Sequence, residues 1–224
     1  MLLLLCYFRC LHPVLCPHIS QVRDMTGDGT VIKRRLREGK GEFPVDCPLH
    51  DTRLTLHYRV RAAAAPGQPP GPWLHDTLSG GACATAAAAE QDWGAAAAAT
   101  HTGATSADTG CGELPEAVEL CAKLMVPGEW ASTAAAPSYA YAGRTDAPAG
   151  LDPNAPAEFE LVLLEFEREG YWQSMPWEER WALAERIKAK ANDLHKRGQH
   201  GHAISRCVHC AWCRRGIGRA VGDG

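Results

Sequence analysis

The sequence predicts an α+β fold, with an antiparallel sheet followed by a helical hairpin. The stretch RLTLHYRV, residues 53–60, alternates apolar and polar side chains, as a half-buried strand does. The stretch AEFELVLLEFE, residues 157–167, shows the same alternation. From residue 174 onward the apolar period becomes that of a helix, and Gly198 separates two helical segments.

The composition excludes several classes of function. A net charge of −3 at pH 7, with no basic stripe, argues against a nucleic-acid partner. Ten cysteines are spread over 224 residues, unlike the dense spacing of a secreted disulfide scaffold. We therefore expect reduced thiols and a cytoplasmic or nuclear protein.

The chain divides into four parts by composition. Residues 1–24 begin with MLLLLCYFRC, which is either a signal-peptide core or an unstructured leader. Arg9 interrupts it and no positive charge precedes it, so the leader is favoured. Residues 25–168 form the predicted sheet domain, and residues 174–216 form the hairpin. The alanine-rich insertion, residues 62–112, lacks an apolar helix face and is expected to have no packed structure.

A short helix and a tyrosine-rich loop are predicted in the second half of the sheet domain. In ELPEAVELCAKLMVPGE, residues 113–129, apolar side chains recur at helical spacing, and Pro127 with Gly128 ends the helix. The stretch PSYAYAG, residues 137–143, holds two of the five tyrosines. It is either a surface turn or the rim of a pocket.

Three of these motifs together resemble the FKBP-type peptidyl-prolyl isomerases: LHY at 56–58, LPEAVELCAKLMVPGE at 114–129 and PSYAYAG at 137–143. The sequence is most similar to the last FKBP domain of plant multidomain immunophilins, in which TPR repeats follow. The resemblance implies an antiparallel half-barrel wrapped around the short helix. It also implies that KANDLHKRGQHGHAI, residues 190–204, belongs to a partial TPR.

The implied reaction is rotation about prolyl peptide bonds. The barrier of about 18–20 kcal/mol comes from amide resonance, so no nucleophile, metal or cofactor is expected. An apolar, water-poor pocket favours the twisted amide, and a few donors hold its carbonyl. The implied partners are proline-containing peptides or proteins and macrolides of the FK506 class.

The resemblance implies that Tyr58 and Phe159 are aromatic walls of the site and that Val118 is its floor. It implies that Leu114 and Pro115 form a loop wall with backbone donors. It also implies a carboxylate from Asp76 and a hydroxyl from Tyr141. By pattern alone, Tyr58 and Phe159 also fit strand core positions. Val118 replaces a family tryptophan, so we expect a degenerate pocket with weak catalysis. The alternative is a non-catalytic FKBP/TPR scaffold or co-chaperone binding module.

Two features of the hairpin raise further possibilities. Lys188 and Asn192 match the first clamp pair of Hsp90-binding TPR domains, but a solvated helix face is favoured for one partial repeat. Binding of an Hsp90 tail is therefore expected only with a complete TPR domain. CVHCAWC places Cys207, Cys210 and Cys213 either in a zinc site or, as we favour, in the second helix.

Overall fold

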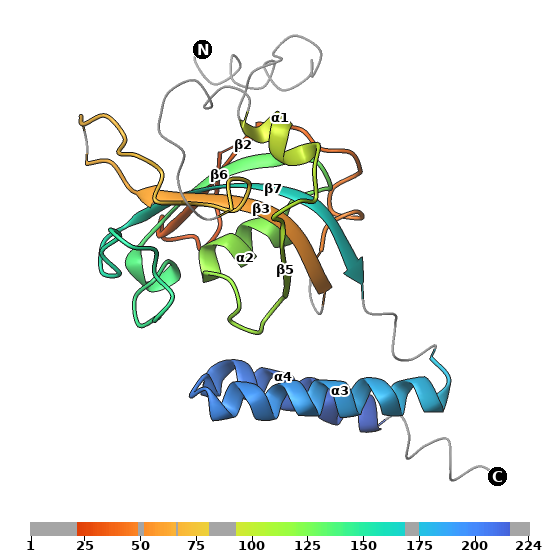
Figure 1. Cartoon of the computed structure of the whole chain (residues 1–224). Helices are drawn as coiled ribbons and strands as arrows, with labels where there is room; N and C mark the ends of the chain where they lie inside the picture. Colours follow the sequence, from red (N-terminus) through yellow and green to blue (C-terminus); the bar gives the residue numbers. More distant parts are fainter. Residues whose placement is uncertain (1–21, 49–51, 66, 81–92, 169–174, 216–224) are drawn as a thin grey trace, which may run out of the picture.

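In the part of the chain that the structure describes, seven strands form one antiparallel sheet (Figure 1). The computed structural model describes residues 22–48, 52–65, 67–80, 93–168 and 175–215, with the backbone alone for 168 and 209–215. Its elements are β1 (Val22–Asp24), β2 (Val31–Arg37), β3 (Thr52–Ala62), β4 (His75–Asp76), α1 (Trp93–Ala98), β5 (Thr105–Asp108), α2 (Glu116–Lys123), β6 (Trp130–Ala135), β7 (Ala157–Arg168), α3 (Trp177–Lys196) and α4 (His200–Arg215). The predicted α+β class is confirmed.

The two long strands β3 and β7 form the centre of the sheet. The strand order is β1–β2–β6–β7–β3–β4, and β5 pairs with β3. Pairing between β3 and β7 runs from Thr52 opposite Arg168 to Ala62 opposite Ala157. The predicted alternation is confirmed, because one face carries the buried side chains Leu54, Leu56, Val60, Phe159, Leu161 and Leu163.

Helix α2 covers this apolar face (Figure 1). The Pro115 carbonyl accepts hydrogen bonds from the Val118 and Glu119 N–H groups at 3.0 and 3.1 Å, which begins the helix. Val118 and Cys121 are fully buried against the sheet. The helix ends at Lys123, before the predicted Pro127–Gly128 stop.

The alanine-rich insertion is packed in the last of its described parts, residues 93–112. Trp93 and Ala97, on α1, are 3% and 0% exposed and contact Val162 on the sheet face opposite α2. The expectation of no packed structure is therefore wrong for residues 93–112, because one tryptophan anchors a helix whose alanines bury little area themselves. Residues 81–92 lie outside the described residues.

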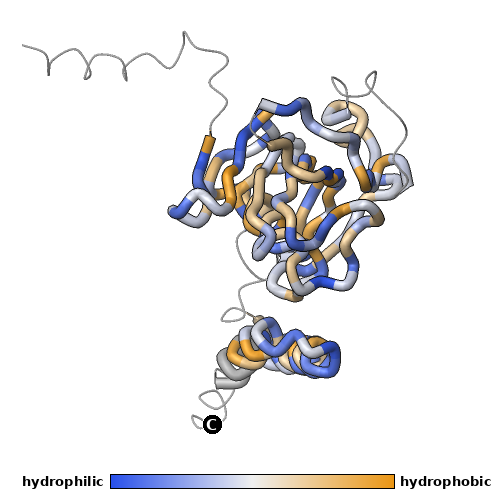
Figure 2. The backbone as a smooth tube through the Cα atoms, turned by 90° about the vertical axis from the view of Figure 1, so that its left-hand side faces the viewer, coloured by the Kyte–Doolittle hydropathy of each residue, from blue (hydrophilic) through white to orange (hydrophobic). Residues whose placement is uncertain are grey.

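The predicted hairpin forms from α3 and α4, which pack against each other (Figure 2). The buried side of α3 includes Ala184, Ile187, Ala191 and Leu194. Trp177 and Trp181 are 56% and 43% exposed. These two lie in the first turns of α3, farthest from the turn that joins the helices. No helix in the described ranges is long and apolar enough to span a membrane.

Candidate functional site

An apolar cluster between α2 and the sheet gathers most of the predicted site residues. Tyr141 and Phe159 face each other with ring centroids 5.9 Å apart. Val118 and Leu114 belong to the same core cluster, and all four are at most 4% exposed. Tyr58 is half-buried and packs against this cluster. The structure therefore brings a floor, a loop residue and three aromatic rings together.

Short local bonds hold the Tyr141 loop in place. A single turn of 3₁₀ helix, Pro137–Tyr139, follows β6. The Ala142 N–H donates to the Pro137 carbonyl at 2.9 Å, and the Arg144 N–H donates to the Tyr141 carbonyl at 2.9 Å. PSYAYAG is therefore a tight loop that turns Tyr141 inward, which favours the pocket-rim interpretation over a surface turn.

Pro115 is buried next to Leu114 but has no N–H group. Its carbonyl is used to begin α2. Leu114 and Pro115 are therefore both buried at the start of α2, and a backbone donor in this loop has to come from a residue other than Pro115.

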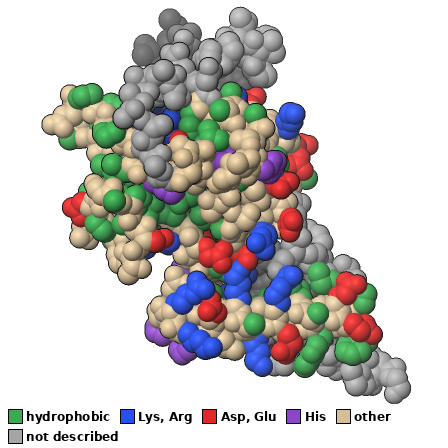
Figure 3. Space-filling model, viewed as in Figure 1, with side chains coloured by type: hydrophobic (Ala, Val, Ile, Leu, Met, Phe, Trp, Pro, Cys, Tyr) green, Lys and Arg blue, Asp and Glu red, His purple; other side chains and the backbone are tan. Residues whose placement is uncertain are grey.

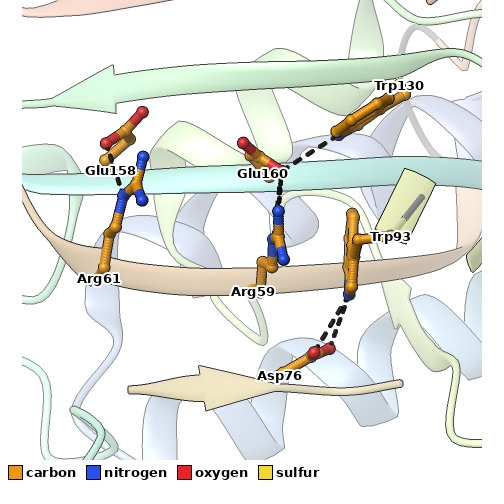
Figure 4. A network of polar contacts seen from close by, with 7 residues as sticks. All are labelled: Arg59, Arg61, Asp76, Trp93, Trp130, Glu158 and Glu160. Atoms are coloured by element: carbon orange, nitrogen blue, oxygen red, sulfur yellow. Dashed lines mark hydrogen bonds and ion pairs between the residues drawn. The ribbon is translucent and has the colours of Figure 1, made fainter. Parts of the chain in front are cut away.

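Asp76 is placed on the other side of the sheet, which corrects its predicted place in the pocket. It lies opposite Arg59 in the β3–β4 register, and opposed residues of antiparallel strands point to the same face. Its carboxylate accepts hydrogen bonds from the Trp93 indole N–H at 3.1 and 3.2 Å (Figure 4). The shift of face follows from the register, which the sequence motif alone does not fix.

Three residues near the cluster are not among the predicted site residues. His75 precedes Asp76 and so points to the opposite face, where its ring lies 5.3 Å from that of Tyr58. Arg144 and Asp146 form a bidentate ion pair, with Nε–Oδ1 at 2.8 Å and Nη2–Oδ2 at 2.6 Å. Opposite charges two residues apart, directly after the tyrosine loop, were a signal that could have identified the pair.

Burial dominates the electrostatics of the two tyrosines. It raises the pKa of Tyr58 above its ordinary value, and the Asp146 carboxylate adds to the rise while Arg144 opposes it. The pKa of Tyr141 is raised by burial, then by Tyr58 and Asp146. Both hydroxyls therefore stay protonated near neutral pH and are available as hydrogen-bond donors.

The arrangement suits binding and twisting of an apolar amide better than bond cleavage. Apolar side chains surround two neutral donors, so the cluster favours an amide that has lost its polar resonance form. Tyr141 is only 2% exposed, so neighbouring side chains cover nearly all of its ring.

Three of the hairpin residues singled out above are exposed. Lys188 and Asn192 lie one turn apart on α3, in agreement with a solvated face. Cys207 is exposed on α4, and the side chains of Cys210 and Cys213 lie outside the described residues. Among the side chains that are described, no group of three or more His, Cys, Asp and Glu is placed to hold a metal ion.

Comparison with known proteins agrees with this geometry. The chain is 34% identical, over 182 residues and 81% of its length, to the peptidyl-prolyl cis-trans isomerase PASTICCINO1 of Arabidopsis thaliana. This chain is a member of the FKBP-type peptidyl-prolyl isomerase family. It spans about a quarter of that FKBP relative, since the match covers 25% of its length. No protein-family model matches the chain.

Solved structures are similar to this FKBP family member as well. A multidomain immunophilin from Arabidopsis thaliana is 23% identical with a TM-score of 0.46, and the match covers 86% of this chain and 64% of the other. The structure of residues 1–211 of CG17282 is 15% identical with a TM-score of 0.51, covering 88% and 77%. At these identities the likeness concerns the fold alone.

Proposed function

We propose that this chain catalyses, weakly, the cis-trans isomerisation of prolyl bonds in proline-containing peptides or proteins. The observation that carries the proposal is the gathering of Tyr58, Tyr141 and Phe159 around Val118 in one apolar cluster. Isomerisation needs only an environment that favours the twisted amide, so apolar and aromatic side chains of this kind are enough for the reaction. Macrolides of the FK506 class are proposed as ligands of the same cluster.

One observation favours a second function, that of a non-catalytic binding module. Tyr141, Phe159 and Val118 are all at most 2% exposed, so the cluster is closed, and Val118 supplies less surface than the tryptophan that the resemblance implies there. A site that opens only by moving its neighbours binds weakly, because the competent state is a fraction of the population. Binding of an Hsp90 tail by Lys188 and Asn192 is proposed only for a longer chain with further repeats.

The test is a protease-coupled isomerisation assay on the full chain with a chromogenic proline-containing tetrapeptide. We expect acceleration above the uncatalysed rate, and a loss of about tenfold in Tyr141→Phe, because a hydrogen bond worth about 1–1.5 kcal/mol is removed. Tyr139→Phe is the matched control, since the same atom is removed from a tyrosine that packs beside the loop. An unaccelerated reaction, with peptide binding retained in calorimetry, would overturn the isomerase proposal in favour of the binding module.

A further inference from the structure

The loop of residues 108–115, which runs from the last residue of β5 to the start of α2, lies between the hairpin and the candidate site. Its Cys111 side chain is 1% exposed and forms a buried cluster with Leu194 of α3 and Ala203 of α4. The thiol is thus covered by the hairpin, although the two segments are about eighty residues apart in the sequence. The hairpin is packed onto the sheet domain at this loop.

Two glycines shape the loop for this contact. Gly110 and Gly112 flank Cys111 and have φ angles of +71° and +65°, which side chains rarely adopt. A Cβ atom on Gly112 would lie 2.9 Å from the Gln199 amide nitrogen and 3.0 Å from the His202 ring. The backbone conformation therefore favours glycine at position 112, and side chains of the hairpin lie directly against it.

Opposite charges meet at the same junction. Lys190 of α3 forms ion pairs with Asp108 and, at 3.6 Å, with Glu113. Arg206 of α4 lies against Gly110, where a Cβ atom would be 3.2 Å from its guanidinium. Figure 3 shows basic and acidic side chains gathered where the hairpin meets the rest of the molecule.

The opposite side of the loop is bonded to the candidate site. The Arg144 Nη1 group donates to the Gly112 carbonyl at 3.0 Å and to the Leu114 carbonyl at 2.9 Å. The Gly110 N–H donates to the Glu119 carboxylate at 2.7 Å, and Glu119 follows Val118 on α2. The loop therefore contacts both the Tyr141 segment and the floor helix.

We propose that docking of the hairpin regulates the candidate site by holding the loop of residues 108–115. The docked hairpin keeps Leu114 next to Val118 and gives Arg144 fixed carbonyl partners, so the Tyr141 loop keeps its position. A partner or condition that lifts the hairpin loosens both walls of the site. This inference rests on the proposed function for its effect on catalysis, but the coupling itself is a property of the fold.

The experiment is amide hydrogen–deuterium exchange on the full chain and on charge variants. Lys190→Glu places a third carboxylate beside Asp108 and Glu113, and Lys196→Glu makes the same change on an exposed position of α3. We expect Lys190→Glu to speed exchange about tenfold in residues 109–119 and 138–146, because local opening sets exchange rates. Lys196→Glu leaves these segments unchanged, and Lys190→Glu with Asp108→Lys restores slow exchange in both.

The outcomes separate the coupling from the enzymatic proposal. Faster exchange in both segments, with slow exchange kept in α3, supports the coupling whether or not the tetrapeptide assay shows activity. Faster exchange confined to the hairpin overturns it, as does a Lys190→Glu variant that exchanges like the parent. If Lys190→Glu unfolds the hairpin, Asp108→Asn tests the same ion pair from the sheet side, and unchanged exchange there also overturns the coupling.

Discussion

The two faces of the sheet are buried by different interactions. The face under α2 is apolar and holds the candidate site, with Phe159 and Val118 fully buried. The face under α1 holds Arg59, which is 3% exposed and lies 4.1 Å from the Trp73 ring and 4.6 Å from the Trp93 ring. Dispersion and area stabilise the first face, whereas charge pairing and cation–π contacts stabilise the second.

The difference shows which face can change shape. The Glu160 carboxylate accepts from Arg59 at 2.7 Å and from the Trp130 indole at 3.3 Å (Figure 4). Burial raises the pKa of Glu160, and Arg59 opposes that rise. A buried ion pair needs both partners, whereas an apolar layer tolerates changes that keep its volume. The candidate site therefore lies on the apolar face, which tolerates changes of shape. The ion pairs on the opposite face hold the strands in place.

Breaking the ionic layer is expected to have the largest effect. Glu160→Leu leaves the Arg59 charge buried without its carboxylate, and we expect a loss of about 3–5 kcal/mol in the free energy of unfolding. Urea denaturation followed by circular dichroism measures it. The double variant Arg59→Met, Glu160→Leu should recover most of the loss, and a double variant as unstable as the single one would contradict the ionic account.

Overfilling the apolar layer is expected to cost less. Val118→Trp places a much larger side chain at a fully buried position, so we expect about 1–3 kcal/mol of destabilisation. Leu36→Trp, at a position 40% exposed, is the control and should cost little. If Val118→Trp is as stable as the parent, the cluster already contains room for a ligand.

His57 makes the α1 face sensitive to acid. Its Nε2 atom lies 3.1 Å from the Thr100 carbonyl, so it carries the proton, and Nδ1 accepts from the Thr77 hydroxyl at 3.0 Å. Burial lowers the pKa of His57 below 6.5, although the Thr100 bond opposes this. As the pH falls, His57 is therefore protonated in the unfolded chain at a higher pH than in the folded chain. The free energy of unfolding that neutral His57 contributes is fully present above pH 6.5 and declines below it.

Chemical denaturation at a series of pH values measures this decline. One proton gives a slope of at most about 1.4 kcal/mol per pH unit. His57→Gln should flatten the profile between pH 6.5 and 5. A His57→Gln profile as steep as that of the parent would assign the acid sensitivity to another group.

The smallest effect is expected on the exposed hairpin face. Lys188→Ala and Asn192→Ala should each change the free energy of unfolding by less than about 0.5 kcal/mol, because neither side chain is buried. Thermal melts of the single variants check this. A loss above about 1 kcal/mol from either would show that this face is covered within the chain.

The parts predictable from sequence were those with strong local periodicity. Strands 53–60 and 157–167 alternate so clearly that their buried faces followed directly, and the resemblance located Tyr141 and Phe159. Asp76 could not be placed, because a two-residue strand takes its facing from the register with Arg59. The packed state of residues 93–112 was equally hidden, since it depends on Trp93 meeting Val162 and on Cys111 meeting α3.

The position of Cys111 also makes its thiol reactivity depend on whether the hairpin is docked. Burial raises the pKa of this thiol to about 11, so almost none is thiolate at neutral pH while the hairpin covers it. Lifting the hairpin would return the thiol to water and to ordinary reactivity. A thiol reagent would then label Cys111 only in molecules whose hairpin has opened. The labelling rate of Cys111 would therefore measure how often the hairpin opens.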